Sequence, residues 1–220
     1  MIEISVSLPH RPYGITIEPG LLSRAASYIE RVHDGRRAVL VVDDQVASLH
    51  GATLRSGFSP EWHLAEHLFP ASEQTKHLES VASIYQTALG NGLDRGSLII
   101  GFGGGVTGDV AGFAAASFLR GIDQILIPTT LLAMVDAAIG GKTGVNLPLP
   151  DGGIGKNLAG AFWQPRSVLV DPLVLSTLDP RELRSGLAEC LKHGFIADPL
   201  LLDFLDREAD ELLAGNPERL

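Results

Sequence analysis

Residues 97–121 read SLIIGFGGGVTGDVAGFAAASFLRG, and this stretch decides the fold. The apolar run SLIIGFGGG indicates a buried strand that leads into a glycine loop, and VAGFAAASFLRG indicates a helix of small residues that leaves it. In the loop, Gly103, Gly105 and Gly108 satisfy the G-x-G-x-x-G pattern. A glycine loop at the start of a helix predicts a phosphate site, because backbone N–H groups there face an anion. The pattern is also compatible with a tight turn, since 25 of the 220 residues are glycine.

The flanking segments extend the same architecture. RAVLVVDD (37–44), QILIPTT (124–130) and SVLVD (167–171) are short apolar runs of the kind found in buried parallel strands. Residues 21–32 and 76–93 place apolar side chains at helical spacing. We therefore predict an α/β fold with a Rossmann-like, mostly parallel sheet and flanking helices, whose ligands bind at the carboxyl edge of the sheet.

Helical spacing dominates from Thr177 onward. We expect an α/β domain over residues 1–176 and the beginning of an α-helical domain over residues 177–220. Because barely two helices follow the sheet, with little partner surface, the chain is expected to be the N-terminal piece of a longer protein.

Composition excludes several functional classes. The net charge of −9 and the lack of a Lys/Arg-rich block argue against nucleic-acid binding. No apolar stretch approaches the roughly 20 residues of a membrane span. A single cysteine, Cys190, indicates a reducing, cytoplasmic compartment, and we expect it to be a small buried side chain. These features predict a small-molecule ligand, with neither nucleic-acid nor membrane partners.

The glycine pattern departs from a standard dinucleotide fingerprint. It lies far along the chain, and Asp109 follows it immediately, whereas the usual ribose-binding acid comes about 20 residues later. Asp43 and Asp44, at the end of an earlier strand, are better placed to bind a ribose.

Four cations are placed to bind an anionic substrate. Arg120, Lys142, Lys156 and Lys192 each lie in apolar or glycine-rich surroundings. A surface charge is the ordinary interpretation of each, but four at the carboxyl edge or the domain junction suit a substrate with phosphate and carboxylate groups.

Glu189 and His193 lie one helical turn apart, with Lys192 beside them. Such a pair can bind a metal from one helix face, although exposed helices also carry such pairs and two residues do not complete a zinc site. His63 and His67 are interpreted as surface residues.

Four longer motifs carry a family resemblance. GGGVTGDVAGFAAASFLRG, IPTTLLAMVDAAIGGKTGVN, GKNLAGAFWQP and LSTLDPRELRSGLAECLKHG occur in the order and nearly the spacing of 3-dehydroquinate synthases. The chain thus resembles that family densely from Gly103 to Gly194 and more weakly back to Asp43.

The resemblance implies a cytoplasmic carbon–oxygen lyase of the shikimate pathway. Its members convert 3-deoxy-D-arabino-heptulosonate 7-phosphate, a phosphorylated sugar acid, to 3-dehydroquinate with loss of phosphate. They use NAD catalytically, a divalent metal, Zn²⁺ or Co²⁺, as a Lewis acid, and a homodimeric assembly.

The resemblance also assigns site residues. The nucleotide contacts are Asp43, Glu73, Lys76, Gly104, Gly105, Val106, Thr107, Gly108, Asp109, Thr129, Thr130, Lys142, Lys156, Val174, Leu175, Ser176 and Thr177. The substrate contacts are Arg120, Asp136, Lys142, Asn157 and Lys192, of which Asp136, Lys142 and Lys192 are catalytic. Glu189 matches one metal ligand, whereas the family gives His193 no such role.

Two departures from the family pattern carry expectations. VNLPLPDGGIGKN, with Leu147 where histidine is common, is longer than the usual VNHPLGKN, so the path of the loop 147–155 is open. The family's two histidine metal ligands are expected beyond Leu220, so we expect weak zinc binding and no turnover by this chain alone.

Three other functions are compatible with these motifs. They are another sugar phosphate cyclase, such as a 2-deoxy-scyllo-inosose or 2-epi-5-epi-valiolone synthase, a glycerol-dehydrogenase-like oxidoreductase, and a nucleotide-binding fragment that is catalytically incomplete. The cations of LRG and GKN favour a phosphorylated acid over a glycerol-like substrate.

Overall fold

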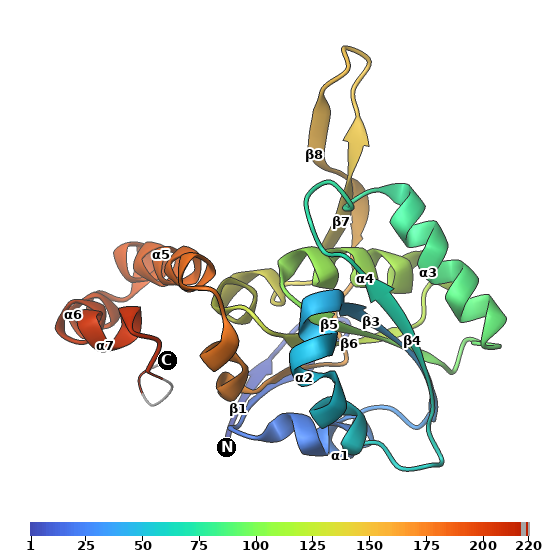
Figure 1. Ribbon diagram of the computed structural model, residues 1–220, viewed down its shortest axis with the longest axis horizontal. Coiled ribbons are helices and arrows are strands. Elements are labelled where there is room, and N and C mark those ends of the chain that lie inside the picture. The colour runs from blue at the N-terminus through green and yellow to red at the C-terminus, as the bar shows by residue number, and fades with distance from the viewer. Residues whose placement is uncertain (217–218, 220) are drawn as a thin grey trace.

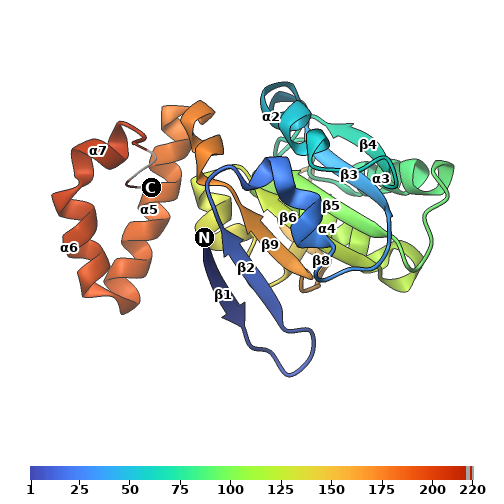
Figure 2. The ribbon, with the colours of Figure 1, turned by 90° about the horizontal axis from the view of Figure 1, so that it is seen from below.

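The computed structural model describes residues 1–216 and 219 and contains one large sheet. Its strand order is β1-β2-β9-β6-β5-β3-β4, and every neighbouring pair is parallel apart from the antiparallel pair β1–β2 (Figure 2). The predicted α/β class with a mostly parallel sheet is therefore confirmed. The strands are β1 (Ile2–Val6), β2 (Tyr13–Ile17), β3 (Arg37–Asp43), β4 (His63–Phe69), β5 (Leu98–Gly103), β6 (Asp123–Pro128) and β9 (Ser167–Val170).

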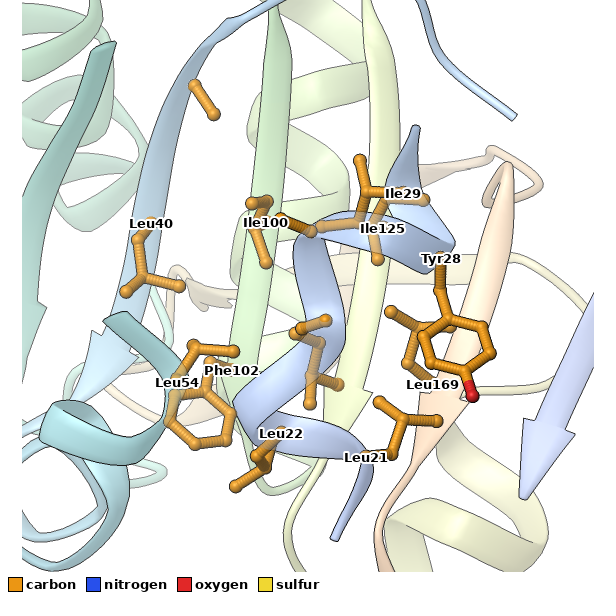
Figure 3. Packing of buried hydrophobic residues seen from close by; sticks show 14 of the residues in the cluster. Leu21, Leu22, Tyr28, Ile29, Leu40, Leu54, Ile100, Phe102, Ile125 and Leu169 are labelled. Atoms are coloured by element: carbon orange, nitrogen blue, oxygen red, sulfur yellow. The ribbon is translucent and has the colours of Figure 1, made fainter. Parts of the chain in front are cut away.

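Helices cover both faces of this sheet because successive strand residues point to opposite sides. On one face, Leu40 and Ile100 pack with Leu21, Leu22 and other side chains of the short helices before β3 and of α2 (Figure 3). On the other face, alternate residues of β3 and β5 pack against α3 and α4. The helices are η1 (Leu21–Arg24), α1 (Ala25–Ile29), α2 (Asp44–Ser56), α3 (Leu78–Gly90) and α4 (Gly105–Ser117).

The glycine run is the start of a helix and not an extended loop. Helix α4 begins at Gly105, five residues before the predicted Val110, and its first backbone bond joins the Gly108 N–H to the Gly104 carbonyl oxygen at 3.1 Å. Small residues permit this sharp turn, because an added β-carbon at Gly103 would lie 2.5 Å from Thr107 Oγ1. Strand β5 therefore passes into α4 with hardly any connecting loop.

The far end of α4 corrects a second expectation. The helix ends at Ser117, and Leu119 and Arg120 adopt left-handed backbone angles, with φ of 50° and 69°. Arg120 lies just before β6 begins, at the amino edge of the sheet, because α4 runs back across the sheet from the carboxyl edge. The prediction that all four cations gather at the carboxyl edge or the domain junction is therefore wrong for Arg120.

The segment interpreted as the loop 147–155 belongs to a β-hairpin. Strands β7 (Lys142–Pro148) and β8 (Ile154–Phe162) form a two-stranded antiparallel sheet that projects from the body of the molecule (Figure 1). The loop is shorter than expected, because β7 extends to Pro148 and β8 begins at Ile154, which leaves 149–153 as the tip.

The chain after β9 consists of helices, which begin before the Thr177 boundary expected from the sequence. It contains η4 (Pro172–Thr177), α5 (Pro180–Ala197), α6 (Pro199–Arg207) and α7 (Ala209–Leu213), which lie beside the sheet (Figures 1 and 2). Asp179 and Asp198 cap α5 and α6 through side-chain bonds to backbone N–H groups. Within residues 1–216 and 219, no helix has the length and apolar character needed to cross a membrane.

Candidate active site

A cleft of about 590 Å³ lies at the carboxyl edge of the sheet. It is bounded by the end of β3, the start of α2, the segment 71–76, the start of α4 and the turn after β9. The structure brings many predicted nucleotide contacts together here: Asp43, Glu73, Lys76, Gly104, Gly105, Val106, Asp109, Thr129, Thr130, Val174 and Thr177.

The N-terminus of α4 is suited to bind phosphate. Gly104 occupies the N-cap position, and no described side chain accepts a bond from the first turn, so backbone N–H groups there are available to a ligand. An added β-carbon at Gly104 would lie 3.1 Å from Thr130 Cγ2, and one at Gly105 would lie 3.2 Å from Ala137 Cβ. Glycine thus keeps this helix end open to an anion, which fits the pyrophosphate of a dinucleotide.

Asp43 holds one wall of the cleft. Its Oδ1 accepts bonds from the backbone N–H groups of Gln45 (3.0 Å) and Val46 (3.1 Å), and its Oδ2 accepts one from Ala71 (3.2 Å). These bonds cap α2 and fasten it to the segment after β4. Asp44, the alternative ribose ligand, is exposed and does not line the cleft.

A nearly buried lysine lies at the back of the cleft. The side chain of Lys76 is 5% exposed, and its Nζ donates to Asp109 Oδ2 and, at 2.6 Å, to Asn157 Oδ1. Burial raises the pKa of the Asp109 carboxyl above its usual value, although the Lys76 ammonium opposes this shift. The Lys76 ammonium therefore offsets part of the cost of burying the Asp109 carboxylate.

A second cleft of about 490 Å³ adjoins the first, because Asp109 lines both. Asp136, Lys142 and Asn157 line it together with the hairpin β7–β8, and Lys142 Nζ lies 3.9 Å from Asp136 Oδ1. Asp136 lies on η3 (Ala133–Ala137), a single π-helical turn after β6. The predicted substrate contacts Asp136, Lys142 and Asn157 therefore share one cavity next to the candidate nucleotide site.

Other predicted contacts lie outside the first cleft. Thr107 and Leu175 are buried, Ser176 is exposed, Gly108 lines a small neighbouring cavity, and Lys156 lies 3.5 Å from Glu73 Oε2. Arg120 lines neither cleft.

Helix α5 carries the remaining candidates. The Lys192 ammonium bonds to Glu189, which raises the pKa of Lys192, and the charge of Asp136 adds to this effect. Glu189 Oε1 also lies 3.5 Å from His193 Nε2, so the one-turn spacing noted in the sequence does bring these side chains close. Residues 1–216 and 219 contain no group of three His, Cys, Asp or Glu side chains arranged to hold a metal. One carboxylate is too few for zinc, so the described residues do not form a metal centre.

Cys190 is half-buried beside Leu183 and Leu175, and burial raises its thiol pKa. His67 is more enclosed than the surface position expected for it, since it contacts Thr87 Oγ1 at 2.7 Å and burial lowers its pKa. His63 is exposed, as predicted.

Sequence reasoning missed several residues of this region, among them Gln45, His50 and Asn146. Gln45 and His50 line the first cleft from α2, a helix that was not predicted, and His50 Nε2 lies 2.7 Å from Thr177 Oγ1. Asn146 links the walls of the two clefts. It is the last residue of the motif GGKTGVN, and nothing in that motif indicates this role.

The chain is similar to known enzymes over nearly all of its length. It is 46% identical to the 3-dehydroquinate synthase of Rippkaea orientalis, covering 100% of this chain and 59% of the relative. It is 50% identical to that of Gloeobacter violaceus, covering 94% of this chain and 56% of the relative. The chain thus spans somewhat less than three fifths of the length of these curated relatives.

A solved structure agrees with the fold. The 2-epi-5-epi-valiolone synthase of Streptomyces hygroscopicus, determined with NAD⁺ and Zn²⁺ bound, is 33% identical, with a TM-score of 0.82 over 96% of this chain and 57% of that one. The family model for the N-terminal part of 3-dehydroquinate synthase matches residues 66–185, which include the glycine run, the second cleft, most of the first cleft and the start of α5. By this match, the chain belongs to the 3-dehydroquinate synthase family.

Proposed function

We propose that the chain is the nucleotide-binding part of a 3-dehydroquinate synthase and contributes one wall of its active site. The enzyme would convert 3-deoxy-D-arabino-heptulosonate 7-phosphate to 3-dehydroquinate and phosphate. The observation that carries this proposal is the junction of two clefts at Asp109, one with an uncapped helix N-terminus and the other lined by Lys142, Asp136 and Asn157. An anion site beside a cavity with its own cation suits a dinucleotide next to a phosphorylated acid.

The residues have distinct tasks in this proposal. The backbone N–H groups at the start of α4 hold the pyrophosphate of NAD, and Asp43 binds a ribose hydroxyl. NAD bound there would supply a reversible hydride acceptor for the substrate. Lys142 and Asn157 bind the anionic substrate, and Asp136 orients Lys142 across their 3.9 Å separation. The Lys76–Asp109 pair separates the two ligands.

The metal and the assembly require residues outside those described. We propose that Glu189 supplies one carboxylate ligand to Zn²⁺ or Co²⁺, with the α5 residue Lys192 near the substrate. Residues 177–220 would begin the helical domain that completes this site, and the full protein would be a cytoplasmic homodimer in which Arg120 contacts substrate. The Zn²⁺ in the valiolone synthase structure supports a metal in this fold.

The identities favour this activity over that of another cyclase. The chain is 46% and 50% identical to two 3-dehydroquinate synthases, against 33% for the valiolone synthase. An assay of substrate choice separates these activities.

The nucleotide site is tested by calorimetric titration of NAD⁺ into this chain. We expect one saturable site per chain and no turnover of the sugar acid by the chain alone. Folded protein that gives no binding heat at any temperature tested, and no change in intrinsic fluorescence, contradicts the proposal.

Catalysis is tested with a chimera. The chain is joined to the part of the Gloeobacter violaceus enzyme that its alignment leaves uncovered, and phosphate release is measured. We expect the chimera to act on 3-deoxy-D-arabino-heptulosonate 7-phosphate, and activity on another sugar phosphate in its place would assign the chain to a different cyclase.

A further inference from the structure

Asn146 lies where the hairpin β7–β8 loses its regular register. Val145 pairs with Ala159 and Leu147 with Gly155, so the single residue Asn146 faces the three residues 156–158. Within this bulge, Asn157 has a left-handed backbone with φ of 54°, a conformation that asparagine tolerates better than most residues. The bulge turns Lys156 and Asn157 out of the regular ladder.

Asn146 is 5% exposed, and it satisfies its polar groups with partners on two separate segments. Its Nδ2 donates to Glu73 Oε2 at 3.0 Å and to the Glu73 carbonyl at 3.3 Å, and its backbone N–H donates to the Lys76 carbonyl at 2.8 Å. Its Oδ1 accepts from the Asn157 backbone N–H at 2.9 Å. One side chain therefore joins the segment 73–76 to the bulge.

These bonds close a ring around the boundary of the two clefts. Asn157 Oδ1 accepts from Lys76 Nζ, which also pairs with Asp109, and Lys156 Nζ lies 3.5 Å from Glu73 Oε2. Glu73, Lys76 and Asp109 line the first cleft, and Asp109 and Asn157 line the second, whereas Asn146 lines neither.

We propose that Asn146 is a positioning residue that sets the geometry of both clefts at once. It holds Asn157 in its left-handed conformation so that Oδ1 meets Lys76, and it holds Glu73 so that its carboxylate faces Lys156. This inference rests on the proposed function only for the identity of the two ligands, a dinucleotide and a phosphorylated acid.

The bonding pattern specifies asparagine at this position. The residue must donate toward Glu73 and accept from Asn157 in the same orientation, and a side-chain amide does both. An Asn146→Asp side chain keeps the shape and the acceptor but places a carboxylate against the Glu73 carboxylate. In the double variant Glu73→Gln/Asn146→Asp, the glutamine amide can donate to the aspartate carboxylate, so the direction of the hydrogen bond is reversed. The pair still carries one negative charge, as Glu73 and Asn146 do together.

The experiment compares Asn146→Asp, Asn146→Ala and the double variant Glu73→Gln/Asn146→Asp with the unaltered chain. Asn91→Asp is the matched control, because Asn91 Nδ2 donates to the Thr87 carbonyl at the end of α3, away from both clefts. Thermal unfolding and circular dichroism establish that each variant is folded. Exchange of the backbone N–H hydrogen of Asn157 with solvent is measured by NMR in the absence of ligand. The affinities for NAD⁺ and for inorganic phosphate are then measured by titration.

We expect Asn146→Ala to accelerate exchange of the Asn157 amide by about tenfold or more, since a buried hydrogen bond contributes roughly that factor to an equilibrium. Asn146→Asp should weaken both NAD⁺ and phosphate binding by about five- to tenfold, and the double variant should recover at least half of each loss on a logarithmic scale. Such recovery would show that the loss arises at the contact between positions 73 and 146.

Unchanged Asn157 exchange in a folded Asn146→Ala chain overturns the proposal, as does an Asn146→Asp loss that the double variant does not recover. Loss of affinity for one ligand only also overturns it, because the residue would then not set both clefts. If the unaltered chain does not bind NAD⁺, the proposed function fails, and the ligand-free exchange measurement still decides the role of Asn146.

Discussion

Replacing Lys76 with methionine leaves the Asp109 carboxylate in the cleft wall without its cation. Removing one member of a buried pair typically costs 3–5 kcal/mol of the free energy of unfolding. The side chain of Asp109 is 20% exposed, so solvent offsets part of this cost. The Asn157 oxygen also loses its donor, which adds about 1 kcal/mol. We expect Lys76→Met to lower the free energy of unfolding by about 2–4 kcal/mol at pH 7, or the melting temperature by roughly 6–12 °C for a chain of this length.

The pH dependence has a definite sign. Burial raises the folded-state pKa of Asp109, so protonation of this group favours the folded chain, and that stabilisation is lost as the pH rises through the folded pKa. Removal of Lys76 raises this pKa further. The destabilisation by Lys76→Met should therefore shrink as the pH falls through this raised pKa, because a protonated Asp109 needs no cation.

Urea unfolding followed by circular dichroism at several pH values provides the measurement. The variant Lys76→Met/Asp109→Asn is the control, since its neutral side chains should recover most of the lost stability at pH 7 and abolish the pH dependence. A loss that stays equal from pH 7 down to the pH at which Asp109 is protonated, or a double variant no more stable than Lys76→Met, would refute the reasoning.

Four further variants concern three glycines and one acidic residue. Gly104→Val should weaken NAD⁺ binding in titration by at least about tenfold, because the added atoms occupy the phosphate site, and should change the melting temperature less, because the backbone angles suit any residue and the added β-carbon meets only the Thr130 side chain, at 3.1 Å. Gly121→Ala should lower the free energy of unfolding by about 2–3 kcal/mol in urea, since φ is 112° and the added β-carbon would lie 2.4 Å from an indole atom. Gly140→Ala, with φ of 90° and open space, should lose only about 1 kcal/mol. The hydrogen bond from His33 lowers the folded-state pKa of Asp123. Asp123→Asn should therefore lower the free energy of unfolding by about 1 kcal/mol at pH 7. In an acid titration, this difference should disappear as the pH falls through the lowered pKa.

The central strands were predictable because both of their faces are buried. Segments 37–44, 124–130 and 167–171 each contain an uninterrupted apolar run, at 38–42, 125–128 and 168–170, and a parallel strand between helix layers favours such a run. The edge strand β4 reads HLAEHLF, and its mixed exposure breaks the apolar run, so it was missed.

The hairpin β7–β8 was missed for a different reason. Its outer part projects from the body, and Ile154, Leu158 and Phe162 are exposed, whereas Val145 is buried against α4, so the hairpin shows no regular alternation of apolar and polar residues. Helix α2 was missed because Asp43 and Asp44 were interpreted as possible ligands, although Asp43 caps that helix.

The candidate site was only partly readable from the sequence. Strand ends such as Asp43, Gly104 and Thr129 share one edge by topology, so their meeting in the first cleft follows from the parallel sheet. The position of Arg120 depends on the length and direction of α4, and the role of Asn146 depends on a bulge between strands distant from Glu73 in sequence. Local sequence carries neither of these spatial relationships.

The start of α4 offers a ligand only peptide N–H groups, which nearly every amino acid possesses and which do not ionise near neutral pH. The specificity of this helix end therefore depends on the atoms that are missing at Gly104 and Gly105. Mutagenesis that deletes side chains cannot reveal such a site, whereas substitutions that add atoms can. Any acid–base response of nucleotide binding must then originate in the surrounding carboxylates and amines, and not in the groups that bind the phosphates.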